Sequence, residues 1–366
     1  MPEEEGKRVL FSGNEMAGEA AIRAGCRFYA GYPITPQNRL TAYMADQLPL
    51  RGGVFIQAES ELAAINMLYG ASAAGARCMT SSSSPGISLK QEGISYLAGS
   101  ELPAVIINVQ RGGPGLGNIA PAQGDYFQAT RGGGHGDYRC IVLAPATVQE
   151  FGDLTYLAFE LADTYRNPVT VLSDGMIGQM MEPVCFDHLT EPSLPPKPWA
   201  LTGEPGRPRN VVKSFHAVVE EMEQFHHEFL AKYERIEREE VRFELAGPED
   251  ADVLLVAYGT SARICRQIVE RPPRELPFRV ALFRPVTLWP FPARQLSELA
   301  GRMRGMLVVE MSAGQMVDDV RLAVEGSCPV ELMCYLGGRL PQAGSVTERL
   351  VDTFARTDAA ARTTGK

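Results

Sequence analysis

Apolar residues in the first half of the chain form short β-type runs, and alanine- and glycine-rich stretches with helical spacing separate them. This alternation is typical of βα units and predicts an α/β fold with a parallel sheet. Strands are predicted at Phe28–Ala30, Val54–Gln57, Arg77–Ser81, Ala104–Val109, Cys140–Leu143 and Val169–Leu172. Helices are predicted at Glu15–Ala24, Gln37–Gln47, Ser60–Ala74, Gly86–Ala98 and Thr147–Ala162.

The pattern is interrupted once and then resumes. A proline-rich stretch over residues 191–208 predicts a linker, and dense charges at helical spacing over Asn210–Phe243 predict a solvent-facing helix. Further strands are predicted within Ala251–Gly259, Phe278–Phe283, Gly305–Glu310 and Val330–Tyr335, and a frayed tail after Ala355. We therefore expect a first α/β domain over residues 1–190, a linker and charged helix over 191–247, and a second α/β domain over 248–366.

Composition narrows the class of protein. With 366 residues, 45% of them hydrophobic and 22% charged, the chain can bury ordinary cores, and its net charge of -9 disfavours nucleic acid as a partner. The N-terminus does not look like a signal peptide, and no apolar run reaches the roughly 18 residues of a membrane span. Seven scattered cysteines without a Cys-x-x-Cys pair fit a reducing compartment and predict no metal site on this chain. We expect a cytoplasmic protein that does not bind membranes.

Candidate chemistry lies where predicted strands end. The three loops concerned are Gly31–Pro36, Gln57–Glu61 and Gln110–Pro114. The carboxyl ends of parallel strands converge on one crevice, so the Thr35 hydroxyl, the Glu61 carboxylate and the Arg111 guanidinium are expected to meet around one ligand.

From the sequence pattern alone, each of these residues could also have a purely structural role. Glu61 could simply complement the dipole of a helix capped by Ser60, and Glu59 is a rival carboxylate two residues away. Arg111 could be an ordinary arginine at the end of a buried strand. Thr35 sits between prolines, which suits a fixed hydroxyl and an ordinary turn equally well.

Three other stretches could carry a different chemistry. The loop Gly112–Gly117 fits neither the dinucleotide fingerprint nor the P-loop. Ser81–Ser84 precedes Pro85 and is expected to cap a helix, and without a nucleophile elbow it does not indicate a hydrolase. The long loop over residues 111–139, which contains Gly132–Asp137, is expected to be functional.

Several strings together resemble a known family. They are Gly31–Pro36 (GYPITP), Glu59–Ala64 (ESELAA), Ala73–Arg77, Ser84–Gly86, Gln110–Pro114 (QRGGP), Leu282–Pro292 and Val309–Gln315. The chain resembles the α subunit of 2-oxoacid:ferredoxin oxidoreductases over nearly its whole length. Within that family Pro36–Asn38, Gln57–Glu61 and Gly132–Tyr138 resemble the branched-chain, 2-oxoisovalerate type.

The resemblance implies a thiamine-diphosphate enzyme divided among several chains. This chain would supply the domain that holds the aminopyrimidine of the cofactor, followed by a transketolase C-terminal-like α/β domain. The diphosphate and its magnesium would be bound by a β subunit, because the Gly-Asp-Gly motif is missing here and Ser173–Gly175 is only its nearest match. Iron–sulfur clusters would likewise belong to partner subunits.

The resemblance also assigns roles to residues. Glu61 matches the glutamate that pairs with the pyrimidine N1′, Thr35 a threonine near the substrate carboxylate, and Arg111 the arginine that binds that carboxylate. Pro33 and Ile34 belong to the same cofactor-binding loop as Thr35. Whether Glu59 or His135 also contributes stays open.

The expected activity is oxidative decarboxylation of a branched-chain 2-oxoacid to an acyl-coenzyme A, with electrons passing to ferredoxin. The expected partners are a β subunit, a γ subunit and a ferredoxin-like δ subunit. Three alternatives are weighed: the same chemistry on 2-oxoglutarate, a non-catalytic scaffold subunit, and a self-contained transketolase-like enzyme. The last would need the missing diphosphate motif.

Overall fold

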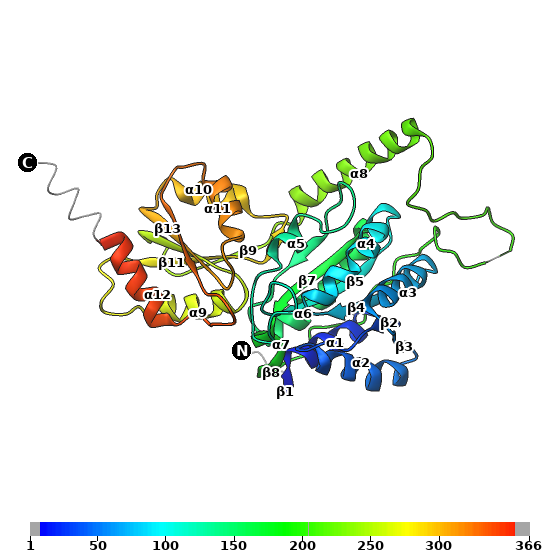
Figure 1. Ribbon diagram of the computed structural model, residues 1–366, viewed down its shortest axis with the longest axis horizontal. Coiled ribbons are helices and arrows are strands. Elements are labelled where there is room, and N and C mark those ends of the chain that lie inside the picture. The colour runs from blue at the N-terminus through cyan, green and yellow to red at the C-terminus, as the bar shows by residue number, and fades with distance from the viewer. Residues whose placement is uncertain (1–7, 204, 356–366) are drawn as a thin grey trace, which may run out of the picture.

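The structure is a computed structural model that describes residues 8–203 and 205–355, folded into two α/β lobes (Figure 1). The first lobe contains a seven-stranded sheet in the order β12-β6-β7-β5-β4-β2-β3, and the second a five-stranded sheet in the order β14-β13-β10-β11-β9. The parallel strands of the first sheet are β2 (Phe28–Gly31), β3 (Val54–Gln57), β4 (Cys78–Ser82), β5 (Ala104–Gln110), β6 (Ile141–Leu143) and β7 (Pro168–Asp174).

These six strands confirm the six predicted from the apolar runs, each within two residues of its expected ends. Every residue of β5 and β7 is buried, as expected for central strands covered by helices on both faces. Parallel strands cannot be joined by a tight turn, so each connection crosses one face of the sheet.

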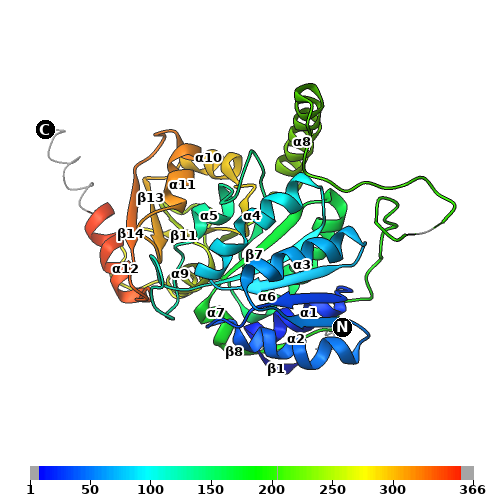
Figure 2. The same ribbon diagram turned by 45° about the vertical axis from the view of Figure 1, so that its right-hand side comes forward.

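Helices cover both faces of this sheet (Figures 1 and 2). Helices α1 (Gly13–Arg23), α2 (Asn38–Leu50) and α6 (Val148–Tyr165) pack together, and α3 (Glu61–Ala73) packs on α4 (Pro85–Gly99). The connection through α2 moves one way along the sheet, whereas those through α3 and α4 move the other way. Since such crossovers are right-handed, the two groups lie on opposite faces.

A two-stranded sheet of β1 (Val9–Ser12) and β8 (Met181–Val184) escaped prediction. The two strands are antiparallel and 169 residues apart from Ser12 to Met181, their partners at one end of the ladder. Short runs of this kind form strands only because a distant segment completes their hydrogen bonds. Between β7 and β8 lies the short helix α7 (Gly175–Gln179).

The second lobe confirms the resumed βα pattern. Its sheet contains β9 (Phe243–Ala246), β10 (Val253–Val256), β11 (Val280–Pro285), β13 (Gly305–Glu310) and β14 (Val330–Cys334). Its helices are α9 (Gly259–Glu270), α10 (Ala293–Ala300), α11 (Met316–Val324) and α12 (Ala343–Leu350), followed by a π-helical turn over Val351–Ala355. Strand β12 (Thr287–Trp289) crosses back and pairs antiparallel with β6 of the first lobe.

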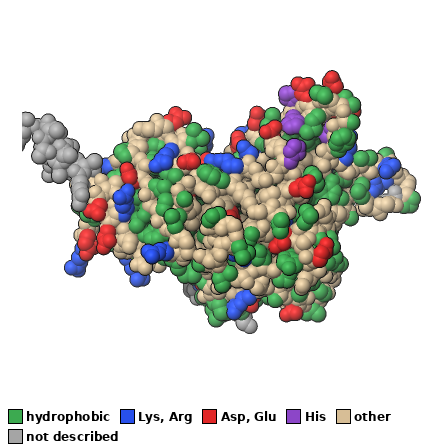
Figure 3. Space-filling view, viewed as in Figure 1, with side chains coloured by type: hydrophobic (Ala, Val, Ile, Leu, Met, Phe, Trp, Pro, Cys, Tyr) green, Lys and Arg blue, Asp and Glu red, His purple; other side chains and the backbone are tan. Residues whose placement is uncertain are grey.

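Two predictions of secondary structure were wrong. The charged helix α8 spans only Val219–Glu239, and its last expected residue, Phe243, instead begins β9, because antiparallel pairing with β11 outweighs the helical charge pattern. The loop over residues 111–139 contains the short helix α5 (Tyr126–Thr130). Helix α8 projects from the body, and histidine side chains gather on it (Figure 3).

Buried polar contacts fix the two lobes to each other. Asp174, at the end of β7, accepts hydrogen bonds from the Thr260 backbone N–H at 3.1 Å and from its hydroxyl at 2.7 Å. Arg284 of β11 donates to both carboxylate oxygens of Glu150 on α6, at 3.0 and 2.7 Å. The lobes therefore present a defined common surface to any ligand or partner.

Candidate active site

Four neighbouring parallel strands end along one edge of the first sheet, in the order β5, β4, β2 and β3. The loops that follow them are the three predicted to carry chemistry and the serine loop after β4. The chain leaves β2 towards β3 and leaves β4 towards β5, in the opposite direction. The strand order thus reverses between β2 and β4, which is where open α/β sheets bind their ligands.

The loop after β2 is tied to the loop after β5. Arg111 Nη1 donates a hydrogen bond to the backbone oxygen of Thr35 at 2.9 Å, and Asn38 Nδ2 donates to the Thr35 hydroxyl oxygen at 3.1 Å. Pro33 is exposed, and Ile34 and Thr35 are half-buried. The structure thus brings Thr35 and Arg111 together and leaves part of this loop accessible to a ligand.

The two rival carboxylates, Glu61 and Glu59, differ in burial. Ser60 caps α3 as predicted, its hydroxyl accepting from the Ala63 N–H at 3.1 Å, and this makes Glu61 the first helical residue. Glu61 is only 6% exposed, whereas Glu59 is exposed in the connecting loop. Within the described parts of the chain, no group donates a hydrogen bond to the Glu61 carboxylate. The carboxylate oxygens are not fully enclosed, so they are open to a ligand that can donate to them.

The Glu61 carboxylate fits against α4 because residue 86 is a glycine. A Cβ at Gly86 would lie 2.6 Å from Glu61 Oε1 and 2.1 Å from Ser82 Oγ. Both distances are far below van der Waals contact, so any larger residue would displace the carboxylate or the hydroxyl. The resembling string Ser84–Gly86 therefore has a physical reason for its glycine.

Arg111 is a buried cation without a counter-ion. Its side chain is held by two backbone carbonyls, that of Thr35 and that of Leu116 at 3.2 Å from Nη2, and the residue is 8% exposed. No carboxylate of residues 8–203 or 205–355 lies within salt-bridge distance, and the buried Nε has no hydrogen-bond partner there. A desolvated guanidinium with free donors is suited to bind an anion, above all a planar carboxylate.

A buried cluster next to Arg111 was not foreseen. Asp125 Oδ2 accepts from Ser84 Oγ at 2.6 Å and from Asn108 Nδ2 at 2.9 Å, and Ser84 Oγ in turn accepts from the Arg111 backbone N–H at 2.9 Å. Burial raises the pKa of the Asp125 carboxyl, and the bonds from Ser84 and Asn108 oppose this shift. The cluster links the loops after β4 and β5.

The expected capping role of the serine loop was wrong. Ser84 stands at the N-cap position of α4, but its side chain makes no capping bond and is used by Asp125. Its φ of 24° is unusual for a residue other than glycine. These contacts indicate that Ser84 belongs to the candidate site and does not serve as a helix cap.

Comparison with known proteins agrees with the geometry. Residues 19–242 match the family described as pyruvate flavodoxin/ferredoxin oxidoreductase, thiamine diphosphate-binding, and residues 251–346 match the pyruvate:ferredoxin oxidoreductase core domain II. The chain belongs to the 2-oxoacid:ferredoxin oxidoreductase family. The resemblance seen in the sequence and the two-part α/β fold that it implied are thereby confirmed.

Individual members of the family are similar over nearly their whole length. The ketoisovalerate oxidoreductase subunit VorB of Methanothermobacter thermautotrophicus is 50% identical, over 93% of this chain and 96% of the relative. The 2-oxoglutarate synthase subunit KorA of Archaeoglobus fulgidus is 40% identical, over 94% and 97%.

Solved structures support the same fold. The 2-oxoglutarate:ferredoxin oxidoreductase from Magnetococcus marinus, with 2-oxoglutarate, coenzyme A and succinyl-CoA bound, superimposes with a TM-score of 0.83 at 26% identity. The match covers 96% of this chain and 66% of that longer chain. A split-gene transketolase shares the fold alone, with a TM-score of 0.52 at 13% identity.

Sequence reasoning also missed Lys90. This lysine of α4 is fully buried, and its Nζ donates to Thr80 Oγ1 at 2.9 Å. Burial lowers its pKa to about 7, and the charge of Glu61 opposes the shift. One signal was available: Lys90 lies four residues after Gly86, and therefore on the helix face of a glycine that marks close packing, where a charged residue needs a partner.

The glycine loop over residues 132–137 lies against α4 and not among the candidate residues. The Tyr138 hydroxyl accepts from the Gly134 N–H at 2.9 Å and donates to Gln91 Oε1 at 3.2 Å. His135 is exposed. The contacts of this loop thus give His135 no connection to Thr35, Glu61 or Arg111.

Ser173–Gly175, the nearest match to a diphosphate motif, has a structural role. The Asp174 carboxylate caps α7 by accepting from the Met176 N–H at 3.0 Å, besides its bonds to Thr260. Across the described residues there is no group of three or more His, Cys, Asp and Glu side chains that could hold a metal ion. No helix in the described part of the chain has the length and apolar character needed to cross a membrane.

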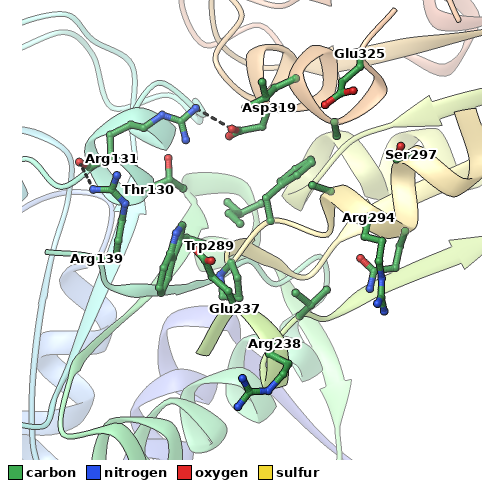
Figure 4. A pocket seen from close by; sticks show the side chains of 18 residues that line it. Thr130, Arg131, Arg139, Glu237, Arg238, Trp289, Arg294, Ser297, Asp319 and Glu325 are labelled. Carbon is green, nitrogen blue, oxygen red and sulfur yellow. Dashed lines mark hydrogen bonds and ion pairs between the residues drawn. The ribbon is translucent and has the colours of Figure 1, made fainter. Parts of the chain in front are cut away.

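A separate hollow of about 770 Å³ lies between the lobes (Figure 4). Its lining comes from α5, α8, α10 and α11 and includes Trp289. Arg131 points across it and donates to Asp319 at 2.8 Å, so one of its basic groups is already neutralised. None of the candidate residues Thr35, Glu61 and Arg111 lines this hollow.

Proposed function

We propose that this chain is the α subunit of a multi-subunit, thiamine-diphosphate-dependent 2-oxoacid:ferredoxin oxidoreductase that acts on branched-chain 2-oxoacids. The observation that carries the proposal is the buried Glu61 carboxylate, open to a donor and next to the reversal of strand order. Identity of 50% to a ketoisovalerate oxidoreductase subunit supports the branched-chain substrate.

The residues present fit the aminopyrimidine half of the cofactor. The hydroxyls of Ser82 and Ser83 and Nε of Arg111 are buried polar atoms without partners in the described structure, and the Glu61 carboxylate lacks a donor. Such atoms are expected where a polar ligand completes the hydrogen bonding. Pro33, Ile34 and Thr35 offer the accessible wall on the side of β2.

When bound, thiamine diphosphate supplies the carbanion chemistry that attacks the 2-oxo carbon. Glu61 would hold a proton between its carboxylate and the ring nitrogen N1′, the geometry in which the 4′ nitrogen can act as a base. The side chain of Glu61 is mostly buried, so this hydrogen bond would act in a lower dielectric than that of bulk water. Gly86 keeps the carboxylate in place against α4.

Arg111 would bind the carboxylate of the 2-oxoacid. The backbone carbonyls of Thr35 and Leu116 fix its orientation, and Nε remains available for a planar anion. Thr35 would contribute its hydroxyl to the same carboxylate. The three residues are the proposed catalytic set.

Partner subunits would complete the site. We propose a β subunit that holds the diphosphate, magnesium and iron–sulfur clusters, with γ and ferredoxin-like δ subunits that pass electrons to ferredoxin. Exposed apolar side chains beside the site support a docked partner: Leu62 is 47% exposed, Leu89 57% and Tyr32 39%. Coenzyme A would accept the acyl group, and the free cysteines are consistent with a cytoplasmic location.

The split site has its own test. The isolated chain should bind thiamine diphosphate only weakly with magnesium, because its residues contact one half of the cofactor. Calorimetry of the isolated chain measures this, and submicromolar affinity would show that the site is not divided.

The substrate is tested on the assembled complex. Reduction of ferredoxin or a viologen is followed over a panel of 2-oxoacids with coenzyme A, and branched-chain acids should give the highest specificity constants. The second candidate is 2-oxoglutarate, favoured by relatives near 40% identity. A preference for 2-oxoglutarate would reverse the assignment, and no turnover of any 2-oxoacid would support a scaffold subunit.

A further inference from the structure

Lys90 has no part in the function proposed above, yet it is the most deeply buried cation next to the site. It is 0% exposed. Thr80 Oγ1 accepts from its ammonium at 2.9 Å and itself donates to the Ala30 backbone oxygen at 2.7 Å, which turns a lone pair towards Lys90. In the described residues this is the one hydrogen bond of an ammonium that has three donors.

Helix geometry directs Lys90 towards Glu61. Gly86 and Lys90 are four residues apart on α4 and lie on the same face, and long side chains in helices lean towards the N-terminal end. The missing Cβ of Gly86 marks the spot where Glu61 Oε1 approaches α4, 2.6 Å from that position. The lysine side chain therefore runs towards the place where the carboxylate rests.

The two charges influence each other without forming a salt bridge. Glu61, from α3, is the one charged group that affects the pKa of Lys90, and its negative charge opposes the lowering by burial. The strand groups next to Lys90 and Gly86 are neutral: the hydroxyls of Thr80 and Ser82 from β4, and the Ala30 carbonyl from β2 that Thr80 binds. The charge of Glu61 thus favours the charged form of Lys90 in the interior.

We propose that Lys90 is a positioning residue that acts through Glu61: its ammonium is the countercharge of the Glu61 carboxylate until the aminopyrimidine binds. The inference rests on the proposed function. A ring protonated at N1′ brings a second positive charge to the same carboxylate, and Lys90 then releases its proton to solvent. The ring gains one proton and Lys90 loses one, so binding requires little net proton uptake.

The proposal predicts a proton count that can be measured without turnover. Calorimetry of thiamine diphosphate binding to the cofactor-free complex, in two buffers with different ionisation heats, gives the number of protons taken up. At about pH 6.5, where Lys90 is mostly charged, the wild type should take up close to none, and Lys90→Met about one proton per site. Equal uptake by the two proteins would overturn the proposal.

Lys232→Met is the matched control. Lys232 is also largely buried, its pKa is also lowered by burial, and its Nζ pairs with Glu101 at 3.2 Å. It lies on α8, outside the candidate site. Lys232→Met should take up protons as the wild type does, and a change like that of Lys90→Met would show a general effect of buried lysines.

Further measurements keep the proposal testable if Lys90→Met does not assemble. Lys90→Gln removes the same charge with a polar side chain. The wild type alone should also take up more protons as pH rises from about 6 to 8, because Lys90 loses its charge near pH 7 before the ring binds. Uptake that stays constant over this range would contradict the release of a proton by Lys90.

Kinetics separate this inference from the proposed function. Lys90→Met should lower kcat for the 2-oxoacid by about tenfold or more with little change in KM, because Arg111 still binds the substrate. A wild-type complex that neither binds the cofactor nor oxidises a 2-oxoacid would refute the proposed function. A wild type that does both, beside a Lys90→Met variant with the same kcat and proton count, would refute only the role of Lys90.

Discussion

Each lobe buries a glutamate near the carboxyl end of a parallel strand and at the start of a helix, but the two carboxylates are treated differently. Glu310, at the end of β13, is 0% exposed and accepts hydrogen bonds from the Ser312 hydroxyl and from the N–H groups of Gln315, Met316 and Val317, at 2.9 to 3.1 Å. Glu61, in the first lobe, is 6% exposed and accepts none from the described residues.

The difference separates a structural carboxylate from a functional one. Glu310 satisfies the free N–H groups at the start of α11 and so stabilises a turn of the fold. Glu61 leaves that task to Ser60 and keeps its oxygens free, and the same edge of the sheet carries a second group without a partner, Arg111 Nε. Position at a strand end is common to both, so the informative feature is the missing hydrogen-bond donor.

The largest expected effect is on catalysis by Glu61→Gln. We expect deuterium exchange at C2 of the bound cofactor to slow by about 10² to 10⁴-fold, the range typical of a lost acid–base group, with subunit assembly intact. Glu59→Gln, the matched control in the exposed loop, should have a much smaller effect. A slow Glu59→Gln beside a normal Glu61→Gln would mean that Glu59 is the catalytic carboxylate.

Arg111→Ala should mainly weaken substrate binding. Removal of one partner of a buried charged pair typically costs about 2 to 5 kcal/mol, which we expect in the specificity constant for the 2-oxoacid. Thr35→Val removes only a hydroxyl and should cost less. Kinetics over a 2-oxoacid concentration series measure both, and an unchanged specificity constant in Arg111→Ala would remove that residue from the site.

The smallest expected effect belongs to the second lobe. Glu310→Gln should lower the free energy of unfolding by about 1 to 3 kcal/mol, because buried N–H groups lose an ionised acceptor. The exchange rate at C2 should stay that of the wild type. Glu61→Gln should show the reverse pattern, a slow exchange at C2 with little loss of stability in urea unfolding. Similar losses of stability in the two variants would contradict the distinction between a structural and a functional carboxylate.

Much of the first lobe could be predicted from local pattern. Apolar runs located its six parallel strands, and Ser60 located the start of α3, because burial and capping are properties of a few consecutive residues. The family strings pointed to Thr35, Glu61 and Arg111. Local pattern failed at the start of β9, where Phe243, predicted as the last helical residue, pairs instead with Pro285 of β11.

The sequence by itself determined that strand ends with polar loops would line one edge of a parallel sheet. It did not determine which polar atoms would be left without partners there. That depended on the right-handed crossovers, which place α4 on α3 and so bring Gly86 and Lys90 to Glu61. It also depended on the loop after β5, which folds back so that Asp125 reaches Ser84. Such contacts join residues 20 or more positions apart, and no local propensity records them.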